Sequence, residues 1–207
     1  MASYTLTTPI ADEEIRRLQV GDTIYLNGVI ITGRDAAHKF LIENYVNHGD
    51  GPVAEPELYE RLKALLDGGV IYHCGPVVRK DEDGNWHFVA AGPTTSIREE
   101  VYQADVIRHF NLKGVIGKGG MGSRTLQACV EQPAVYLHAI GGAGTLIAQA
   151  VEEVEDVLKL EFGVPEAMWV IRVKDFPVVV TMDSHGNSIH DQVEAASREK
   201  FAALLAV

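Results

Sequence analysis

Two short segments carry side chains whose types suit anion binding better than a hydrophobic core. GPTTSIR holds Thr94, Thr95 and Arg98 just after a Gly-Pro turn, and GKGGMG holds Lys118 among glycines. Three hydroxyls ahead of a helix could cap it, although a cap needs only one or two of them. The helix dipole disfavours an arginine in the first turn, unless an anion docks there. These residues therefore predict an anion site built on turns.

Arg34 supplies a third cation, in GRDAAH, where an expected strand meets an expected helix. It could fork onto a carboxylate ligand or pair with Asp35 or another neighbouring acid, and spacing alone favours the second. If Arg34, Arg98 and Lys118 converge at one end of a sheet, two arginines and a lysine would suit a dicarboxylate.

The glycine loops leave other functions open. GKGGMG matches GxGxxG letter for letter, but no acidic residue ends a strand about twenty residues later, as a dinucleotide fold requires. We expect a tight turn that presents Lys118. GGAG, at residues 141–144, could form an anion nest or pack a helix closely on a strand. A nucleotide-binding module is therefore one alternative, and a non-catalytic assembly subunit is another.

Composition limits the class of protein. The 207 residues carry a net charge of −11, which opposes binding to nucleic acid or to an anionic membrane surface. No apolar run reaches the ~18 residues of a transmembrane helix, and the N-terminus lacks the basic-then-apolar order of a signal peptide. We therefore expect a cytoplasmic protein.

Neither the cysteines nor the histidines form a metal motif. Cys74 and Cys129 make no CxxC pair, are expected to be free thiols, and are too few to hold a 4Fe–4S cluster. His138, in an apolar strand, is expected to be a core histidine with its hydrogen bonds satisfied. Any cluster would have to come from another chain.

Alternating strands and helices predict a single α/β domain over residues 1–207, with β/β/α layers and a mixed sheet. We expect a first helix capped by Thr8 with a proline after it and a hairpin that turns at Asn27-Gly28. A second hairpin around DEDG, two strands on either side of Lys174-Asp175 and a final helix would follow.

The chain resembles the β subunit, or C-terminal domain, of class I iron–sulfur hydro-lyases, which include the class I fumarases and L(+)-tartrate dehydratase. The resemblance runs from about Gly21 to about Gln192, with the family's separation between Thr94 and Lys118. It rests on GRDAAH, GPTTSIR, GKGGMG, HAIGGAGTLIAQ and KDFPVVVTMDSHGN. It implies a swivelling β/β/α domain.

The same resemblance implies a division of labour between two subunits. A separate α subunit, in a heterodimer or heterotetramer, would hold a 4Fe–4S cluster through three cysteines, with one iron open as a Lewis acid for a C4 dicarboxylate. In this chain the catalytic residues would be Thr94, as the proton-transfer group, and Lys118. The substrate-binding residues would be Arg34, Arg98, Thr95 and Gly119.

Two departures from the family pattern concern the substrate. Glu99-Glu100 follows Arg98 where class I fumarases often have Met-Asp, and GGMGSRT follows Lys118, a form closer to the two-subunit enzymes. Fumarate or malate is the first expected substrate and tartrate the second, with a methylated relative such as mesaconate as a further possibility.

Overall fold

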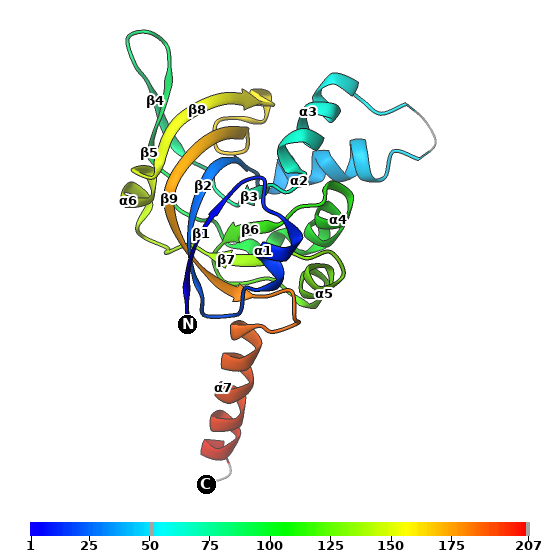
Figure 1. Ribbon diagram of the computed structural model, residues 1–207, viewed down its shortest axis with the longest axis vertical. Helices are drawn as coiled ribbons and strands as arrows, with labels where there is room; N and C mark the ends of the chain where they lie inside the picture. Colours follow the sequence, from blue (N-terminus) through cyan, green and yellow to red (C-terminus); the bar gives the residue numbers. More distant parts are fainter. Residues whose placement is uncertain (50–51, 206–207) are drawn as a thin grey trace.

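A seven-stranded mixed sheet forms the centre of the molecule (Figure 1). The computed structural model describes residues 1–49 and 52–205. The strand order is β1-β2-β3-β6-β7-β9-β8, and β2 also pairs with β9, so that β2, β3, β6, β7 and β9 close into a ring. Neighbours among β1, β2, β3, β6 and β7 are parallel, and β9 is antiparallel to β2, β7 and β8. The strands are β1 (Ser3–Thr7), β2 (Thr23–Thr32), β3 (Val70–Tyr72), β6 (Gly114–Gly117), β7 (Val135–His138), β8 (Val151–Leu158) and β9 (Met168–Met182).

Helices cover one side of this sheet, and Figure 1 shows α2 to α5 gathered there while α7 projects away from the body. No helix within the described residues combines the length and the apolarity that crossing a membrane requires. The helices are α1 (Asp12–Arg16), α2 (Asp35–Leu41), the π-helix η1 (Ile42–Val46), α3 (Pro56–Leu66), the 3-10 helix η2 (Ser96–Glu99), α4 (Glu100–Phe110), α5 (Ser123–Glu131), α6 (Gly144–Ala148), the 3-10 helix η3 (Leu160–Phe162) and α7 (Ile189–Leu205).

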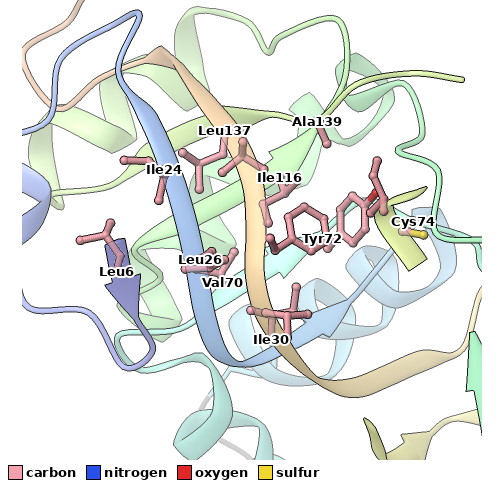
Figure 2. Close-up of a cluster of buried hydrophobic side chains, with 14 of the residues drawn as sticks. Leu6, Ile24, Leu26, Ile30, Val70, Tyr72, Cys74, Ile116, Leu137 and Ala139 are labelled. Atoms are coloured by element: carbon pink, nitrogen blue, oxygen red, sulfur yellow. The ribbon is translucent and has the colours of Figure 1, made fainter. Parts of the chain in front are cut away.

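Side chains alternate between two hydrophobic clusters, as the period of two in a strand requires. On β3, Val70 and Tyr72 point into the cluster inside the ring, which Figure 2 shows, whereas Ile71 packs toward the helices. On β7, Leu137 and Tyr136 divide in the same way. The cluster inside the ring and the cluster beneath the helices separate three layers of secondary structure. This arrangement confirms the predicted mixed α/β fold.

Two predictions near the N-terminus are wrong. Thr8 does not cap a helix, because its hydroxyl donates to the Val29 carbonyl at 2.8 Å and its N–H to the Asn27 carbonyl at 3.0 Å. Helix α1 begins later, after Ala11. Asn27-Gly28 is not a hairpin turn either: β2 runs through it, with a register shift opposite β9 and a left-handed Gly28 at φ +96°. The glycine provides a bulge.

The C-terminal half also differs from the prediction in part. Lys174-Asp175 does not separate two strands, because β9 is continuous, and the Asn27 side chain accepts the Asp175 N–H at 2.8 Å where the backbone turns left-handed. Strand β8 was not predicted. The hairpin of β4 (Val77–Lys80) and β5 (Trp86–Ala90) around DEDG is confirmed, and so is the final helix, α7.

Candidate active site

The cationic and hydroxyl residues predicted from the sequence lie at one edge of the sheet. Arg34 follows β2, His73 follows β3, Lys118 follows β6 and His138 ends β7. These strands are parallel neighbours, so their carboxyl ends meet at the same edge. The crevice outside the carboxyl ends of parallel strands is where α/β sheets commonly bind ligands.

The GPTTSIR segment is fastened across this edge by backbone hydrogen bonds. The Thr94 N–H donates to the His73 carbonyl at 2.7 Å, the Lys118 N–H donates to the Thr94 carbonyl at 3.2 Å, and the Ser96 N–H donates to the Lys118 carbonyl at 3.1 Å. Thr94 and Lys118, far apart in sequence, are therefore neighbours. Thr95 and Gly119 follow them and are exposed at the rim.

The three hydroxyls do not act as helix caps. Thr95 is the N-cap residue of η2 but makes no capping bond with its side chain. The Thr94 Oγ1 atom is buried and has no hydrogen-bond partner within the described residues. Ser96 Oγ contacts His73 and Tyr136 instead. A buried hydroxyl without a partner is costly, and this leaves Thr94 available to a ligand.

Each arginine is held by an acid of the same chain. Arg34 pairs with Glu166 at 3.1 Å, rather than with Asp35, and Glu166 also accepts the Ala36 N–H at 3.1 Å. Arg98 takes Asp35 instead, at 2.9 Å. The Arg34 Nε atom is buried without a partner in the described part of the chain. A guanidinium carries several N–H donors. Each ion pair with an acid therefore fixes the orientation of the guanidinium and leaves other N–H groups free to bind a ligand.

The glycine loop after β6 is a tight turn, as predicted. Gly119 and Gly120 have left-handed φ angles of +83° and +78°, which glycine adopts without strain. Lys118 is half-buried at the start of this turn. Among residues 1–49 and 52–205, its ammonium forms no ion pair.

The nucleotide-binding alternative conflicts with the contacts of both glycine loops. At the N-terminus of α5, the Glu100 carboxylate already accepts the Gly122 N–H at 2.8 Å and the Thr125 hydroxyl at 2.6 Å. It therefore fills the place that a phosphate would take. In the second loop a Cβ on Gly144 would lie 3.1 Å from the Gly92 backbone nitrogen, so this glycine serves close packing.

Comparison with known proteins agrees with this geometry. The model of the Fumarase C-terminus family matches residues 2–193. The chain belongs to this family. A Geobacillus stearothermophilus protein named fumarate hydratase class I is 55% identical over 198 residues, which are 96% of this chain and 35% of that protein. The chain thus spans about a third of that relative.

Shorter relatives in the family are matched along most of their length. The L(+)-tartrate dehydratase subunit beta of Escherichia coli K12 is 42% identical over 185 residues, 89% of this chain and 85% of that subunit. A protein named as the same subunit in Methanocaldococcus jannaschii is 38% identical over 198 residues, 95% of both chains.

This member of the fumarase C-terminus family buries an acid that accepts no hydrogen bond within the described residues. Glu99 is fully buried, and neither carboxylate oxygen has a hydrogen-bond partner in the described residues. The nearest cation is Arg98, at 4.0 Å. Burial, followed by repulsion from Asp35, raises the pKa of Glu99 to about 7.

Replacing Glu99 by glutamine should stabilise the protein more at pH 8 than at pH 5. The raised pKa means that the folded state resists ionisation, so wild-type stability falls as pH rises from the ordinary value of 4.5 through about 7. Glu99→Gln removes that cost, and we expect a gain of roughly 1–3 kcal/mol at pH 8 and little at pH 5, measured by urea unfolding.

The matched control for this substitution is Glu131→Gln. Arg108 lowers the pKa of the exposed Glu131 carboxyl, so its contribution is present at high pH and is lost as pH falls. Glu131→Gln should therefore lower stability at pH 8. A gain in Glu99→Gln that did not change with pH would contradict the assignment of Glu99 as an ionised buried group.

The thiols and histidines do not fit a cluster site in this chain. Both cysteines are buried and free, and burial raises the pKa of Cys74 and of Cys129 to about 12, which opposes the thiolate that iron needs. In the described ranges no three His, Cys, Asp or Glu residues lie together as a metal site. The prediction for His138 is wrong: its Nδ1 atom is buried but has no partner.

Three buried residues of this site were not predicted: His38, His73 and Gln103. Spacing gave a usable signal for Gln103, since Val106, Ile107 and Phe110 share its helix face and are buried. A glutamine on an apolar face needs hydrogen-bond partners. No comparable signal pointed to His73, because β3 is too short to show a pattern.

Proposed function

We propose that this chain is the β subunit of an iron–sulfur-dependent hydro-lyase that reversibly hydrates a C4 dicarboxylate, with fumarate and malate as the first substrate pair. The observation that carries the proposal is the convergence of Arg34, Arg98, Thr94 and Lys118 at one sheet edge. The proposed domain spans residues 1–207. The fumarase and tartrate dehydratase relatives support the reaction class.

Each side chain has a role that its surroundings support. Arg34 and Arg98, anchored by Glu166 and Asp35, would each bind one end of the dicarboxylate through charge-assisted hydrogen bonds. Dehydration of malate removes a proton from one carbon and hydroxide from the next, giving fumarate and one water. Thr94, whose hydroxyl is buried and unpartnered in the described chain, would take the proton.

A threonine hydroxyl is a weak base, so the site must favour its ionised form. Two cations, Arg98 and Lys118, would stabilise an alkoxide at Thr94, and exclusion of water by the bound substrate would strengthen this effect. Thr95 and Gly119, at the rim beside them, would complete the substrate contacts.

A partner is part of this proposal. Since the thiols of this chain do not fit as cluster ligands, we assign a 4Fe–4S cluster to a separate α subunit in a heterodimer or heterotetramer. Helix α7 supports a partner, because it exposes Val193, Phe201 and Leu204, and a groove of about 630 Å³ separates it from Gly119. A subunit that completes the site beside Gly119 would also cover this helix. Free thiols support a cytoplasmic location.

The second candidate substrate is L(+)-tartrate, which would yield oxaloacetate. The match to nearly the full length of the tartrate dehydratase β subunits supports it. Malate and tartrate differ by one hydroxyl, so a single polar contact could discriminate between them.

The deciding experiment is anaerobic co-expression with an α-type subunit, followed by turnover assays on malate, L(+)-tartrate and D-tartrate. Turnover of malate, monitored by the absorbance of the new double bond, would support the first assignment. Turnover of tartrate alone would replace fumarase with tartrate dehydratase. An intact cluster without turnover of any of the three would contradict the proposal, and Lys118→Met should abolish whichever activity is found.

A further inference from the structure

A chain of buried side chains runs beneath the candidate site and joins two of its segments. His38 Nδ1 lies 3.0 Å from the Arg34 carbonyl, and His38 Nε2 lies 2.9 Å from the Gln103 Oε1 atom. The same amide atom lies 2.9 Å from His73 Nε2, and His73 Nδ1 lies 2.8 Å from Ser96 Oγ. His38, His73, Ser96 and Gln103 are all fully buried. Solvent therefore cannot satisfy these groups.

The Arg34 carbonyl fixes the proton positions in this chain. A backbone carbonyl only accepts, so His38 Nδ1 must carry a proton. Burial lowers the pKa of His38, which is neutral, and its Nε2 atom therefore has no proton. Whatever faces His38 Nε2 at 2.9 Å must donate, so the two ends of the Gln103 amide must exchange places. Its NH2 group then faces His38, and its oxygen takes the position of the Gln103 Nε2 atom that has no partner within the described residues.

The second histidine follows from the first. The NH2 group that faces His38 also faces His73 Nε2, and an amide nitrogen has two hydrogens to donate. His73 therefore accepts at Nε2. Burial lowers the pKa of His73 to about 3, so the ring is neutral and its single proton lies on Nδ1, which donates to Ser96 Oγ. The opposite amide orientation would leave His38 Nδ1 and the Arg34 carbonyl facing each other with no proton between them.

We propose that Gln103 is a positioning residue, whose amide donates to His38 and His73 and through them fixes the backbone of Arg34 and the hydroxyl of Ser96. Arg34 and Ser96 belong to two different segments of the site: Arg34 lies in GRDAAH, after β2, and Ser96 follows Thr94 and Thr95 in GPTTSIR. One buried amide thus sets the distance between the carboxylate-binding and proton-transfer segments.

Packing around Ser96 leaves little room for this series of buried side chains to shift. Tyr136 donates its hydroxyl to Ser96 Oγ at 2.8 Å. A Cβ at Gly117 would overlap Ser96 Oγ and lie 2.9 Å from the Tyr136 hydroxyl. Position 117, at the end of β6, must therefore be glycine. Ser96 is therefore held by His73, Tyr136 and the backbone of β6 together.

The decisive measurement is the histidine tautomer state in the 207-residue wild-type chain by long-range 1H–15N NMR. We expect His38 and His73 each to show a protonated Nδ1 and a non-protonated Nε2, with no titration between pH 6 and 8. The exposed His185 provides the internal reference signal of a solvent-accessible ring. A proton on Nε2 of either buried ring would overturn the proposal.

Substitution of Gln103, the central residue of this hydrogen-bonded series of side chains, tests the same proposal. A carboxylate cannot donate, so in Gln103→Glu both rings should move their proton to Nε2 or become doubly protonated. Gln149→Glu, at an exposed position, should leave both rings unchanged. Unchanged tautomers in a folded Gln103→Glu variant would remove Gln103 from its assigned role.

The activity measurement rests on the proposed function. In the complex with the α-type subunit, Gln103→Glu should lower kcat/KM by roughly 10- to 100-fold, as misplaced supporting groups do, and Gln149→Glu should not. A normal kcat/KM together with switched tautomers would show that these hydrogen-bonded buried side chains do not position the site. If the complex hydrated no dicarboxylate at all, the tautomers would still decide the orientation of Gln103.

Discussion

Replacing Thr94 by valine should leave the protein folded and nearly inactive, with kcat lower by roughly 10²- to 10⁴-fold, the range of a lost proton-transfer group. Valine keeps the shape of threonine and lacks only the hydroxyl. Because Thr94 Oγ1 is buried without a partner in the described chain, its removal breaks no hydrogen bond. The melting temperature should therefore stay the same or rise. Steady-state kinetics of the two-subunit complex, with melting curves, would measure both effects.

The neighbouring hydroxyls provide the controls for this substitution. Thr95→Val, one residue away and exposed, should have a much smaller effect on kcat. Thr94→Ser retains a hydroxyl and should recover part of the activity. If Thr94→Val kept a kcat within a few-fold of wild type, some other group would be the base, and the unpartnered hydroxyl would need another explanation.

The location of this site could be predicted from the sequence, but its internal support could not. The segments GRDAAH and GKGGMG each follow a strand, and carboxyl ends of parallel strands share an edge. Which acid would hold each arginine depends on contacts between distant parts of the chain: Glu166 reaches Arg34 from the loop before β9, leaving Asp35 for Arg98. Spacing along the sequence contains no information of this kind.

Two of the errors in the fold prediction have one physical source. Asn27-Gly28 and Lys174-Asp175 both look like breaks in a strand, and each does distort the backbone, at Gly28 and Asp175. They are paired with each other across β2 and β9, where the Asn27 side chain bonds the Asp175 N–H. The two irregularities face each other on paired strands and together form a β-bulge instead of two turns. Pairing between β2 and β9 overrides the local preference for turns.

Replacing Arg98 by alanine should cost about 2–5 kcal/mol of transition-state stabilisation, the usual loss when a charged hydrogen-bonding partner is removed. That range corresponds to a fall in kcat/KM from about 30-fold to several thousand-fold. Protein stability should change little, since Arg98 and Asp35 are each nearly half exposed and an exposed ion pair contributes only ~0–1 kcal/mol. Kinetics over a range of dicarboxylate concentrations, with urea unfolding, would separate these two effects.

Arg108 is the control that tests whether the location of Arg98 at the sheet edge matters for activity. Arg108 lies on α4, which directly follows the 3-10 helix η2 that holds Arg98, and it pairs with Asp105 and Glu131. Arg108→Ala therefore removes two ion pairs of comparable exposure away from the sheet edge. Its kcat/KM should match wild type. Arg98→Lys should recover only part of the loss, because an ammonium cannot hold Asp35 and a substrate carboxylate with one planar fork. Equal kinetics for Arg98→Ala and Arg108→Ala would exclude Arg98 from carboxylate binding and leave Arg34 and Lys118 as the only cations of the set.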